Sequence, residues 1–311
     1  MKILFLECVS KSENSIDAHV RNCYLLQEYL KTKEHICDLE FNNTMNKNHK
    51  TDYDVIIVSY ASFYCNFEEM KRIMKNNKKA RLYWITNEYD LFPNGSLYKL
   101  FKERNAEIIA NFESSASKTK VFKRHHMLNL NLLFFQQKEE QNKKYSICYY
   151  GTFRKNRTKY FKKYINNKEF YLSSSSKNFK KFKSIGCNFK PIKKMKWGEN
   201  KDTLGLFKYS LYIEDEYTHN NFNNLANRFY EALSNDTVVL FDRSCINTLK
   251  KSEIAKFDYS DFIIDDLKNI NDRDYIKDVK KQNEWKQYIE DCRRKMLEEF
   301  EEIIKGDYIP S

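Results

Sequence analysis

Arg228 and Glu231 are the side chains of this sequence whose types and spacing point most directly to chemistry. Three residues apart, they are predicted to share one face of a helix, where a cation and a carboxylate can bind one polar molecule. The apolar run Thr237–Phe241 follows, and it is typical of a buried strand in a parallel sheet. A polar pair beside such a strand is where α/β proteins hold nucleotides. A surface ion pair on an amphipathic helix would give the same pattern. Four apolar residues of the segment can line its other face: Leu225, Phe229, Ala232 and Leu233.

A second candidate site is the turn YYGTFRKNR, which begins at Tyr149. A strand is predicted to end at Gly151 and a helix to begin a few residues later. Backbone N–H groups at such a helix start, together with Arg154 and Arg157, suit a diphosphate. A strand-to-helix turn with solvated basic residues would look the same. The chain has no Gly-x-Gly-x-x-Gly and no Gly-Lys-Ser/Thr sequence, which argues against a dehydrogenase and a P-loop ATPase.

The charge balance favours a polyanionic partner. Lys and Arg number 55 against 43 Asp and Glu, a net charge of +12. Two lysine-rich segments, 117–126 and 177–197, could neutralise the phosphates of a duplex, and an aromatic side chain among them could fill the gap left by a flipped base. The alternative for the second segment is a solvated helix whose Phe residues belong to the core. The predicted DNA-binding residues are Lys118, Lys120, Lys123, Arg124, Lys180, Lys181, Lys183, Lys193 and Lys194.

The cysteine pattern and hydropathy exclude several protein classes. The eight cysteines are scattered without a Cys-x-x-Cys pair, which argues against a zinc site and a disulfide framework. A predicted strand follows Met1 directly, and no apolar run approaches 18 residues. We therefore expect no signal peptide and no membrane span, and a reduced, cytoplasmic protein.

Strands and helices alternate in both halves of the chain, which predicts parallel sheets. In the first half the expected strands are 2–9, 36–41, 54–60, 81–86 and 107–112, with helices at 18–31, 67–76 and 98–105. After a linker at 136–144, strands are expected at 146–151, 170–173, 211–214, 237–241 and 261–264, with helices at 158–166 and 284–304. The fold class is α/β, with two doubly wound Rossmann-like domains facing a central cleft. The expected domains are residues 1–140, 141–280, and a C-terminal helix, 281–311, that packs back across both.

Three segments together resemble the DNA β-glucosyltransferases of T-even bacteriophages: YGTFR from Tyr150, LYIEDEYTHNNF from Leu211, and RFYEALSNDTVVLFD from Arg228. That family has a Tyr-Gly-Gly-Ser-Phe-Arg turn, a strand ending in Gly-Asp with Asp-Asn-Phe downstream, and an Arg-x-x-Glu helix before an apolar strand ending in Asp. Residues 213–222 align without a gap and match Asp215, Asn221 and Phe222, while a two-residue difference in spacing precedes Arg228. The resemblance covers residues 146–245, and the N-terminal half in outline. Arg-x-x-Glu is shared by many two-domain (GT-B) glycosyltransferases.

The resemblance implies a GT-B enzyme that moves glucose from UDP-glucose, with inversion, onto 5-hydroxymethylcytosine in double-stranded DNA. Arg154, Arg157 and Arg228 would then hold the diphosphate, and convergent arginines suit the charge that develops on a leaving UDP. Glu231 would accept the ribose hydroxyls. A divalent cation such as Mg²⁺ could assist at the diphosphate, although no Asp-x-Asp motif is present. The implied donor-binding residues are Gly151, Thr152, Phe153, Arg154, Arg157, Asp215, Arg228 and Glu231.

The general base is where this chain departs from the family. The family places an Asp directly after a Thr at the end of a first-domain strand, whereas Thr86 here is followed by Asn87, whose amide cannot take a proton usefully. Glu88 and Asp90 lie in the same turn, and a carboxylate in a dry site would have its pKa raised toward the working pH. Asp90 is slightly favoured. His19, at the start of the helix after the first strand, is the rival.

The sequence thus predicts a phage-encoded, monomeric hexosyltransferase of the host cytoplasm that modifies DNA and so helps it evade restriction. Two alternatives stay open. One is a glycosyltransferase of the same fold that acts on polysaccharide or another non-DNA acceptor. The other is a catalytically inactive DNA-binding relative, which Asn87 would allow.

Overall fold

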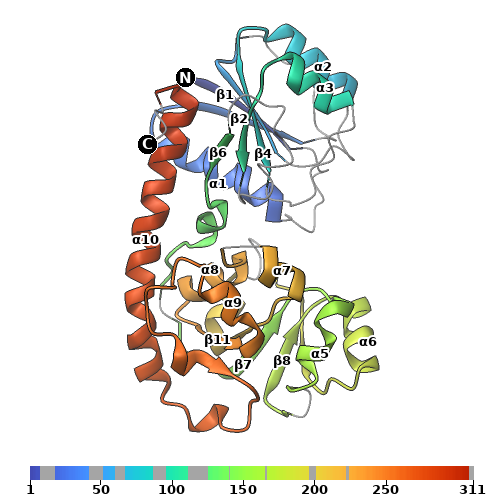
Figure 1. The fold of residues 1–311 in the computed structure, drawn as a ribbon, viewed down its shortest axis with the longest axis vertical. Coiled ribbons are helices and arrows are strands. Elements are labelled where there is room, and N and C mark those ends of the chain that lie inside the picture. Colours follow the sequence, from blue (N-terminus) through green and yellow to red (C-terminus); the bar gives the residue numbers. More distant parts are fainter. Residues whose placement is uncertain are drawn as a thin grey trace. The chain divides into compact units, whose positions relative to one another are not determined.

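The computed structural model describes residues 1–7, 18–41, 52–59, 67–86, 96–110, 125–139, 141–164, 167–195, 201–221 and 224–307. The chain forms two compact units, the first comprising Met1–Leu133 with Arg294–Ser311 and the second Phe134–Arg293. Each unit is built on its own six-stranded parallel sheet with flanking helices (Figure 1). Among the described residues, no helix is both long and apolar enough to cross a bilayer.

The sheet of the first unit has the strand order β2-β1-β3-β4-β5-β6. Its strands are β1 (Lys2–Glu7), β2 (Ile36–Phe41), β3 (Val55–Val58), β4 (Arg81–Thr86), β5 (Glu107–Ala110) and β6 (His125–Met127). Helices α2 (Phe67–Asn76) and α3 (Ser96–Glu103) bury Met70, Ile73 and Phe101 against Leu4 and Leu6 of β1. Because side chains alternate along a strand, Ile3 and Phe5 point to the opposite face, where α1 (Ala18–Thr32) lies (Figure 1). The unit is therefore doubly wound, as predicted.

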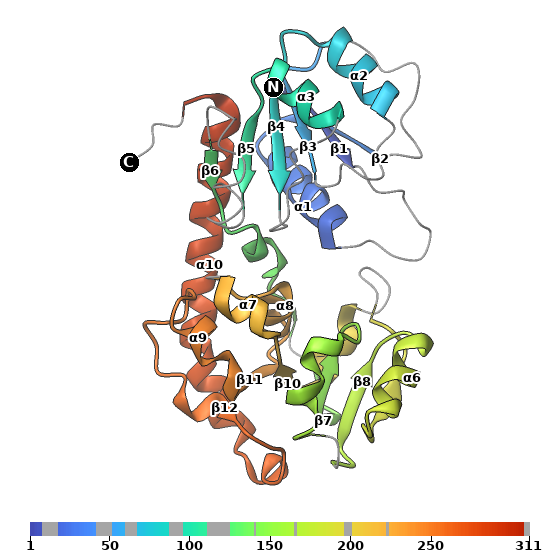
Figure 2. The same ribbon diagram turned by 45° about the vertical axis from the view of Figure 1, so that its right-hand side comes forward.

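The sheet of the second unit has the strand order β12-β11-β10-β7-β8-β9. Its strands are β7 (Tyr145–Tyr150), β8 (Phe170–Ser173), β9 (Lys190–Ile192), β10 (Phe207–Tyr212), β11 (Val238–Asp242) and β12 (Ile263–Ile264). Its shorter helices are α5 (Thr158–Phe161), α6 (Ser176–Ser184), α7 (Glu216–Asn221), α8 (Asn227–Ser234) and α9 (Ile246–Leu249). Helix α6 lies beside β8 (Figure 2). The chain runs outward from β7 to β9 and then returns to place β10 against the other side of β7. The order therefore reverses between β7 and β10, which is where doubly wound sheets bind ligands.

Helix α10 (Tyr275–Lys305) contributes to the core of both units. In the second unit Trp285 is 2% exposed, and its ring centroid lies 4.9 Å from that of Phe262. In the first unit the carbonyl of Ile303 accepts a hydrogen bond of 2.8 Å from the hydroxyl of Tyr83. The helix begins nine residues before the predicted Glu284, because Tyr275 and Arg273 are already held against the sheet. The two compact units divide the chain between residues 133 and 134 and between 293 and 294. The domain boundaries predicted at 140 and 280 stay a prediction.

Several further elements differ from the sequence predictions, and strands β6 and β9 and helix α9 were not predicted at all. Helix α5 has four residues instead of the nine predicted for 158–166, and β10 covers 207–212 instead of 211–214. Residues 216–221 form helix α7 because the carboxylate of Asp215 accepts the backbone N–H of Thr218, a helix N-cap. The predicted linker, in its described residues, is bound to the second unit, since Gln136 N donates to Ser234 Oγ and Lys144 N to the carbonyl of Leu206.

Short 3₁₀ turns join these elements. They are η1 (Leu130–Phe134), η2 (Lys155–Arg157), η3 (Lys201–Leu206), η4 (Arg243–Cys245), η5 (Ser260–Phe262) and η6 (Ile270–Asp272). The turn η2 matters most for the site, because it directly follows Gly151–Arg154 at the carboxyl end of β7.

Candidate functional site

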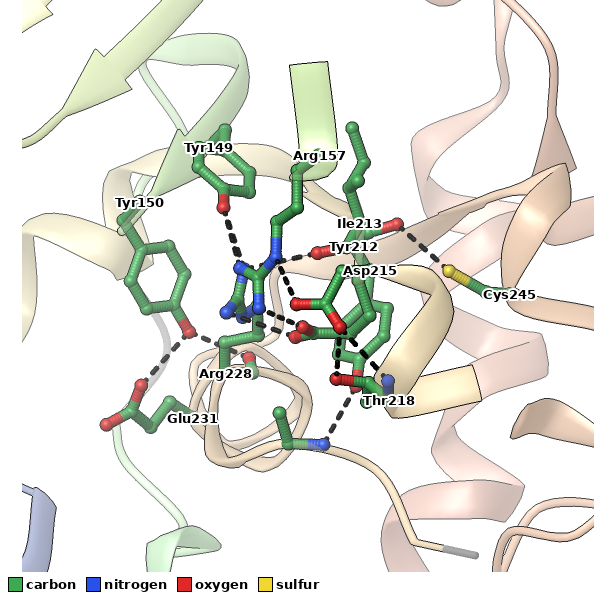
Figure 3. Close-up of polar contacts among 12 residues, drawn as sticks. Tyr149, Tyr150, Arg157, Tyr212, Ile213, Asp215, Thr218, Arg228, Glu231 and Cys245 are labelled. Atoms are coloured by element: carbon green, nitrogen blue, oxygen red, sulfur yellow. Dashed lines mark hydrogen bonds and ion pairs between the residues drawn. The ribbon is translucent and has the colours of Figure 1, made fainter. Parts of the chain in front are cut away.

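Buried Arg157 and largely buried Arg228 converge at the point where the second sheet reverses its strand order (Figure 3). Arg157 comes from the turn after β7, and Arg228 from the first turn of α8. Both pair with the carboxylate of Glu214, which follows β10: Arg157 Nη2 contacts Oε2, and Arg228 Nη2 lies 3.0 Å from Oε1. Arg157 Nε also lies 3.4 Å from Asp215 Oδ2. Two guanidinium groups thus share one buried carboxylate and point to one place.

The hydroxyl of Tyr149 ties the two guanidiniums together from a second side. It accepts hydrogen bonds of 3.3 Å from Arg157 Nη1 and 3.0 Å from Arg228 Nη1. The ring centroid lies 5.5 Å from the Arg228 guanidinium carbon, a cation–π distance. The ring itself is fully buried and packs edge-on against Phe161. The position of each arginine is therefore fixed by a carboxylate, a hydroxyl and an aromatic face.

Gly151 closes the turn against this tyrosine. Its φ of +150° is a conformation that other residues rarely adopt, and an added Cβ would lie 3.3 Å from Tyr149 Oη. Its N–H donates to the carbonyl of Ser173, and its carbonyl accepts the hydroxyl of Ser174 at 2.6 Å. Glycine at this position thus allows the chain to turn directly beside the arginine pair.

Glu231 is held by a different tyrosine. The hydroxyl of Tyr150 lies 2.7 Å from the carbonyl oxygen of Arg228 and 3.1 Å from Glu231 Oε2, and these two acceptors share its single proton. The guanidinium of Arg228 instead pairs with Glu214. The interpretation of Arg228 and Glu231 as a surface ion pair is therefore wrong, because the arginine side chain is 14% exposed and faces a carboxylate from another element. The four apolar residues predicted for the opposite face of this helix are buried.

Charge and burial oppose each other in this cluster. Burial is the largest single effect and would lower the pKa of Arg228 and of Arg157, but the carboxylate of Glu214 together with the Tyr149 hydroxyl outweighs it, so both pKa values are raised. Burial would likewise raise the pKa of Asp215. Hydrogen bonds from Thr218, with the charge of Arg157, outweigh that effect and lower it. The arginines and Asp215 are thus held in their charged forms, as binding of a polyanion requires.

The remaining predicted donor-binding residues lie around this cluster. Arg154 and Thr152 are exposed, and the charge of Arg154 contributes to the lowered pKa of Asp215. Phe153 is half-buried, and its ring lies 5.1 Å from that of Phe182. The sequence reasoning missed Tyr149, Tyr150 and Glu214. Each lies at or just beyond the carboxyl end of a strand that carries a predicted site residue, and that position was the available signal.

Two of the three candidate bases, Glu88 and Asp90, lie outside the described residues, as does Asn87 before them. So does part of the predicted DNA-binding set: Lys118, Lys120, Lys123 and Arg124. His19 lies in the first turn of α1, where the backbone is described. Their roles stay predictions.

The described lysines of the second basic segment are exposed: Lys180, Lys181 and Lys183 on α6, and Lys193 and Lys194 after β9. Two of the aromatic residues among them, Phe182 and Phe189, are not available to a flipped base, because they are 1% and 9% exposed. Phe182 packs with Phe153 and Phe161, and Phe189 packs against Phe182. For these two rings the core interpretation is correct: Phe182 lies on the apolar face of α6, and Phe189 directly precedes β9.

Comparisons with solved structures place the whole chain in one architecture. The T4 phage β-glucosyltransferase in complex with UDP and Mn²⁺ matches with a TM-score of 0.68 at 15% identity, covering 98% of this chain and 99% of that one. A second structure of the DNA-modifying enzyme β-glucosyltransferase gives 0.64 at 16% identity, with 98% and 100% covered. An α-glucosyltransferase with UDP and a 13-mer DNA gives 0.62 at 11% identity, with 96% and 94% covered.

The chain has the GT-B fold of these glucosyltransferases. The predicted fold class is thereby confirmed, and at these identities the likeness is one of fold. No family model matches the sequence, and no curated protein matches it either. Within the GT-B fold of this chain, the arginine pair lies at the switch point of the second sheet.

Proposed function

We propose that this protein is a glycosyltransferase that moves a sugar, glucose from UDP-glucose, onto DNA. The observation that carries the proposal is the buried Arg157–Arg228 pair at the switch point of the second sheet. Proteins that share this fold over their whole length have been solved in complex with UDP, UDP-glucose or DNA. The site and the fold thus support the same class of reaction.

The diphosphate would bind the N–H groups that the protein does not use. A guanidinium has five N–H donors. In the described part of the chain, Arg157 contacts Asp215, Tyr149 and Glu214, and Arg228 contacts Tyr149, Ile213 and Glu214. Two donors on each side chain are left for phosphate oxygens. Exposed Arg154 could reach the diphosphate from the solvent side.

Glu231 would orient the nucleoside. An ionised carboxylate accepts hydrogen bonds and can take both vicinal hydroxyls of a ribose. Tyr150 holds one of its oxygens at 3.1 Å and is itself bonded to the backbone of α8. A rotamer fixed in this way loses little conformational entropy when the ligand binds.

In the proposed reaction an acceptor hydroxyl oxygen attacks C1 of glucose as the bond from C1 to the β-phosphate oxygen breaks. The bonding electron pair leaves with UDP, so negative charge grows on the β-phosphate, where the two arginines stabilise it. The hydroxyl proton passes to a general base, for which Asp90, Glu88 and His19 are the candidates. Direct attack from the opposite side would invert the configuration at C1.

DNA is proposed as the acceptor because basic side chains border the donor-site turn. Ser173 links Lys193 to the turn: its hydroxyl donates to the carbonyl of Lys193, and its carbonyl accepts a hydrogen bond from the N–H of Gly151. The ammonium of Lys181 lies 5.9 Å from the ring centroid of Phe153. Lysines placed here would neutralise duplex phosphates next to the donor without reading sequence. The proposed acceptor group is the hydroxymethyl of a modified pyrimidine, which supplies the nucleophilic hydroxyl.

The described residues around the arginine pair offer few ligands to a divalent cation. In the described part of the chain, no three His, Cys, Asp or Glu side chains gather into a metal site. Glu214 and Asp215 are already bound by arginines. An ion at the diphosphate would therefore be held largely by phosphate oxygens and water, as Mg²⁺ commonly is.

Transfer from radiolabelled UDP-glucose tests this proposal. The acceptors are a duplex with 5-hydroxymethylcytosine, the same duplex with cytosine, and a lipid-linked sugar. We expect label on the hydroxymethylated duplex alone, and loss of transfer in Arg228→Ala and Glu231→Ala with DNA affinity kept within about twofold. Label on the lipid-linked sugar instead would show that the acceptor is a sugar and not DNA. UDP binding without transfer to any acceptor would indicate an inactive relative.

A further inference from the structure

Glu214 is the buried group of the donor site to which the proposed reaction gives no role. Its side chain is 2% exposed, and its two oxygens face two different guanidiniums. Asp215 beside it bonds Thr218 and Arg157, so it serves as the N-cap of α7. Glu214 caps no helix, and the described partners of its carboxylate are the two arginines. Its position is therefore set by the ligand-binding side chains.

The charges of the cluster are balanced before any ligand arrives. Arg157 and Arg228 carry two positive charges, and Glu214 and Asp215 carry two negative ones. A nucleotide diphosphate brings at least two further negative charges to the same guanidiniums. Such charges interact strongly in a partly buried site, because solvent screens them poorly. The diphosphate and Glu214 must therefore compete for the same cations.

Two guanidiniums that lie side by side away from solvent need a neighbouring anion both when the donor site is empty and when a nucleotide is bound. Removing one partner of a buried ion pair is strongly destabilising, because an uncompensated charge remains. In the empty protein Glu214 is the anion that contacts both arginines. With a nucleotide bound, phosphate oxygens could do the same. The resembled family ends this strand in Gly-Asp, so the carboxylate at 214 belongs to this chain's version of the site.

We propose that Glu214 is a positioning residue that acts as a built-in counter-ion: it holds Arg157 and Arg228 in place while the donor site is empty, and it weakens the binding of UDP so that the product leaves. This inference rests on the proposed function, because it assigns UDP to the arginine pair. It predicts that the Glu214 side chain increases the stability of the ligand-free protein and decreases its affinity for the nucleotide.

Calorimetric titration with UDP tests it in the wild type, in Glu214→Gln and in Glu216→Gln. Glu216 is a matched control, because it loses the same charge two residues along the chain, where its carboxylate is exposed and pairs with Lys159. We expect UDP to bind about tenfold more tightly to Glu214→Gln, since one carboxylate no longer opposes the diphosphate in a poorly screened site. In the control the affinity should change by less than about twofold, because solvent and salt screen exposed charges.

Thermal unfolding supplies a readout that a purely structural role would not give. Without ligand, Glu214→Gln should melt below the wild type, and saturating UDP should remove most of that difference. If the Gln variant does not fold alone, Glu214→Gly offers a smaller replacement, and UDP present during purification should recover it. A variant that UDP does not recover contradicts the counter-ion role.

The outcomes separate the two proposals. A wild type that does not bind UDP refutes the proposed function. A wild type that binds UDP, with Glu214→Gln binding it equally or more weakly, refutes the counter-ion role and leaves the proposed function standing. Tighter binding in the variant, with stronger inhibition of transfer by added UDP, supports both.

Discussion

Replacing Tyr149 by Phe removes one hydroxyl and leaves its ring in place. That oxygen accepts hydrogen bonds from both guanidiniums, at 3.3 Å and 3.0 Å. A hydrogen bond to a charged group contributes about 1.5–3 kcal/mol, and the longer of these two is weak. We therefore expect the free energy of unfolding of the second unit to fall by about 2–3 kcal/mol. The contacts of the ring with Phe161 and with the Arg228 guanidinium would remain, so packing losses are small.

The measurement is urea unfolding followed by tryptophan fluorescence, because Trp285 lies in the core of the second unit. Tyr145→Phe is the matched control: it makes the same change at the other end of β7, on a ring that is 37% exposed. The control should stay within about 0.5 kcal/mol of the wild type, as surface substitutions do. A Tyr149→Phe protein as stable as the control would refute the reasoning that this hydroxyl organises the arginine pair. Saturating UDP should reduce the loss, since phosphate oxygens can accept the orphaned N–H groups.

Three further outcomes follow from the same geometry. Gly151→Ala should lower the free energy of unfolding by about 1–3 kcal/mol and weaken UDP binding, because φ is +150° and the new Cβ would press on the Tyr149 hydroxyl. Chemical unfolding would measure the change in stability, and UDP titration the change in affinity. Burial lowers the pKa of His219 from its ordinary 6.5, although the carboxylates of Glu214, Asp215 and Asp242 oppose this. As the pH falls, the unfolded chain therefore takes up this proton before the folded protein does. The free energy of unfolding should be at its full value above pH 6.5 and decrease below it, by at most about 1.4 kcal/mol per pH unit. The double variant Lys193→Gln/Lys194→Gln should bind duplex DNA less tightly and lower the slope of log affinity against log salt by about 1.8, with UDP binding unchanged.

Each of these has a result that would contradict it. Wild-type stability in Gly151→Ala would mean that the turn tolerates a side chain there. His219→Gln should flatten the acid limb of the stability profile, and an unchanged limb would place the titration elsewhere. Lys250→Gln/Lys251→Gln, two adjacent exposed lysines outside both basic segments, should leave the salt slope unaltered. An equal change in both double variants would show that net charge, and not position, governs DNA affinity.

The alternation of elements was predictable because it depends on local periodicity. Parallel strands read as short apolar runs, and β2 and β4 match their predicted bounds residue for residue. The amphipathic helix before β11 was likewise visible, and its apolar residues are buried as expected. Helix α7 was missed, since its start depends on a side-chain cap at Asp215 inside a segment that reads as a continuing strand. Local hydrogen bonds of this kind have little signature in hydropathy.

What the sequence determined by itself is which residues are candidates for the chemistry and on which elements they lie. Arg157, Arg228 and Glu231 follow from types and spacing, because a helical turn and a strand end have fixed local geometry. Asp215 was added by the family resemblance. The partners of these residues were decided by the tertiary structure alone. Arg157 reaches Glu214 because β10 returns beside β7, which brings together strand ends about sixty residues apart in sequence. Arg228 pairs with the same carboxylate rather than with Glu231 because its helix, α8, packs against β10. Strand order arises from packing across the whole sheet, and no local pattern encodes it.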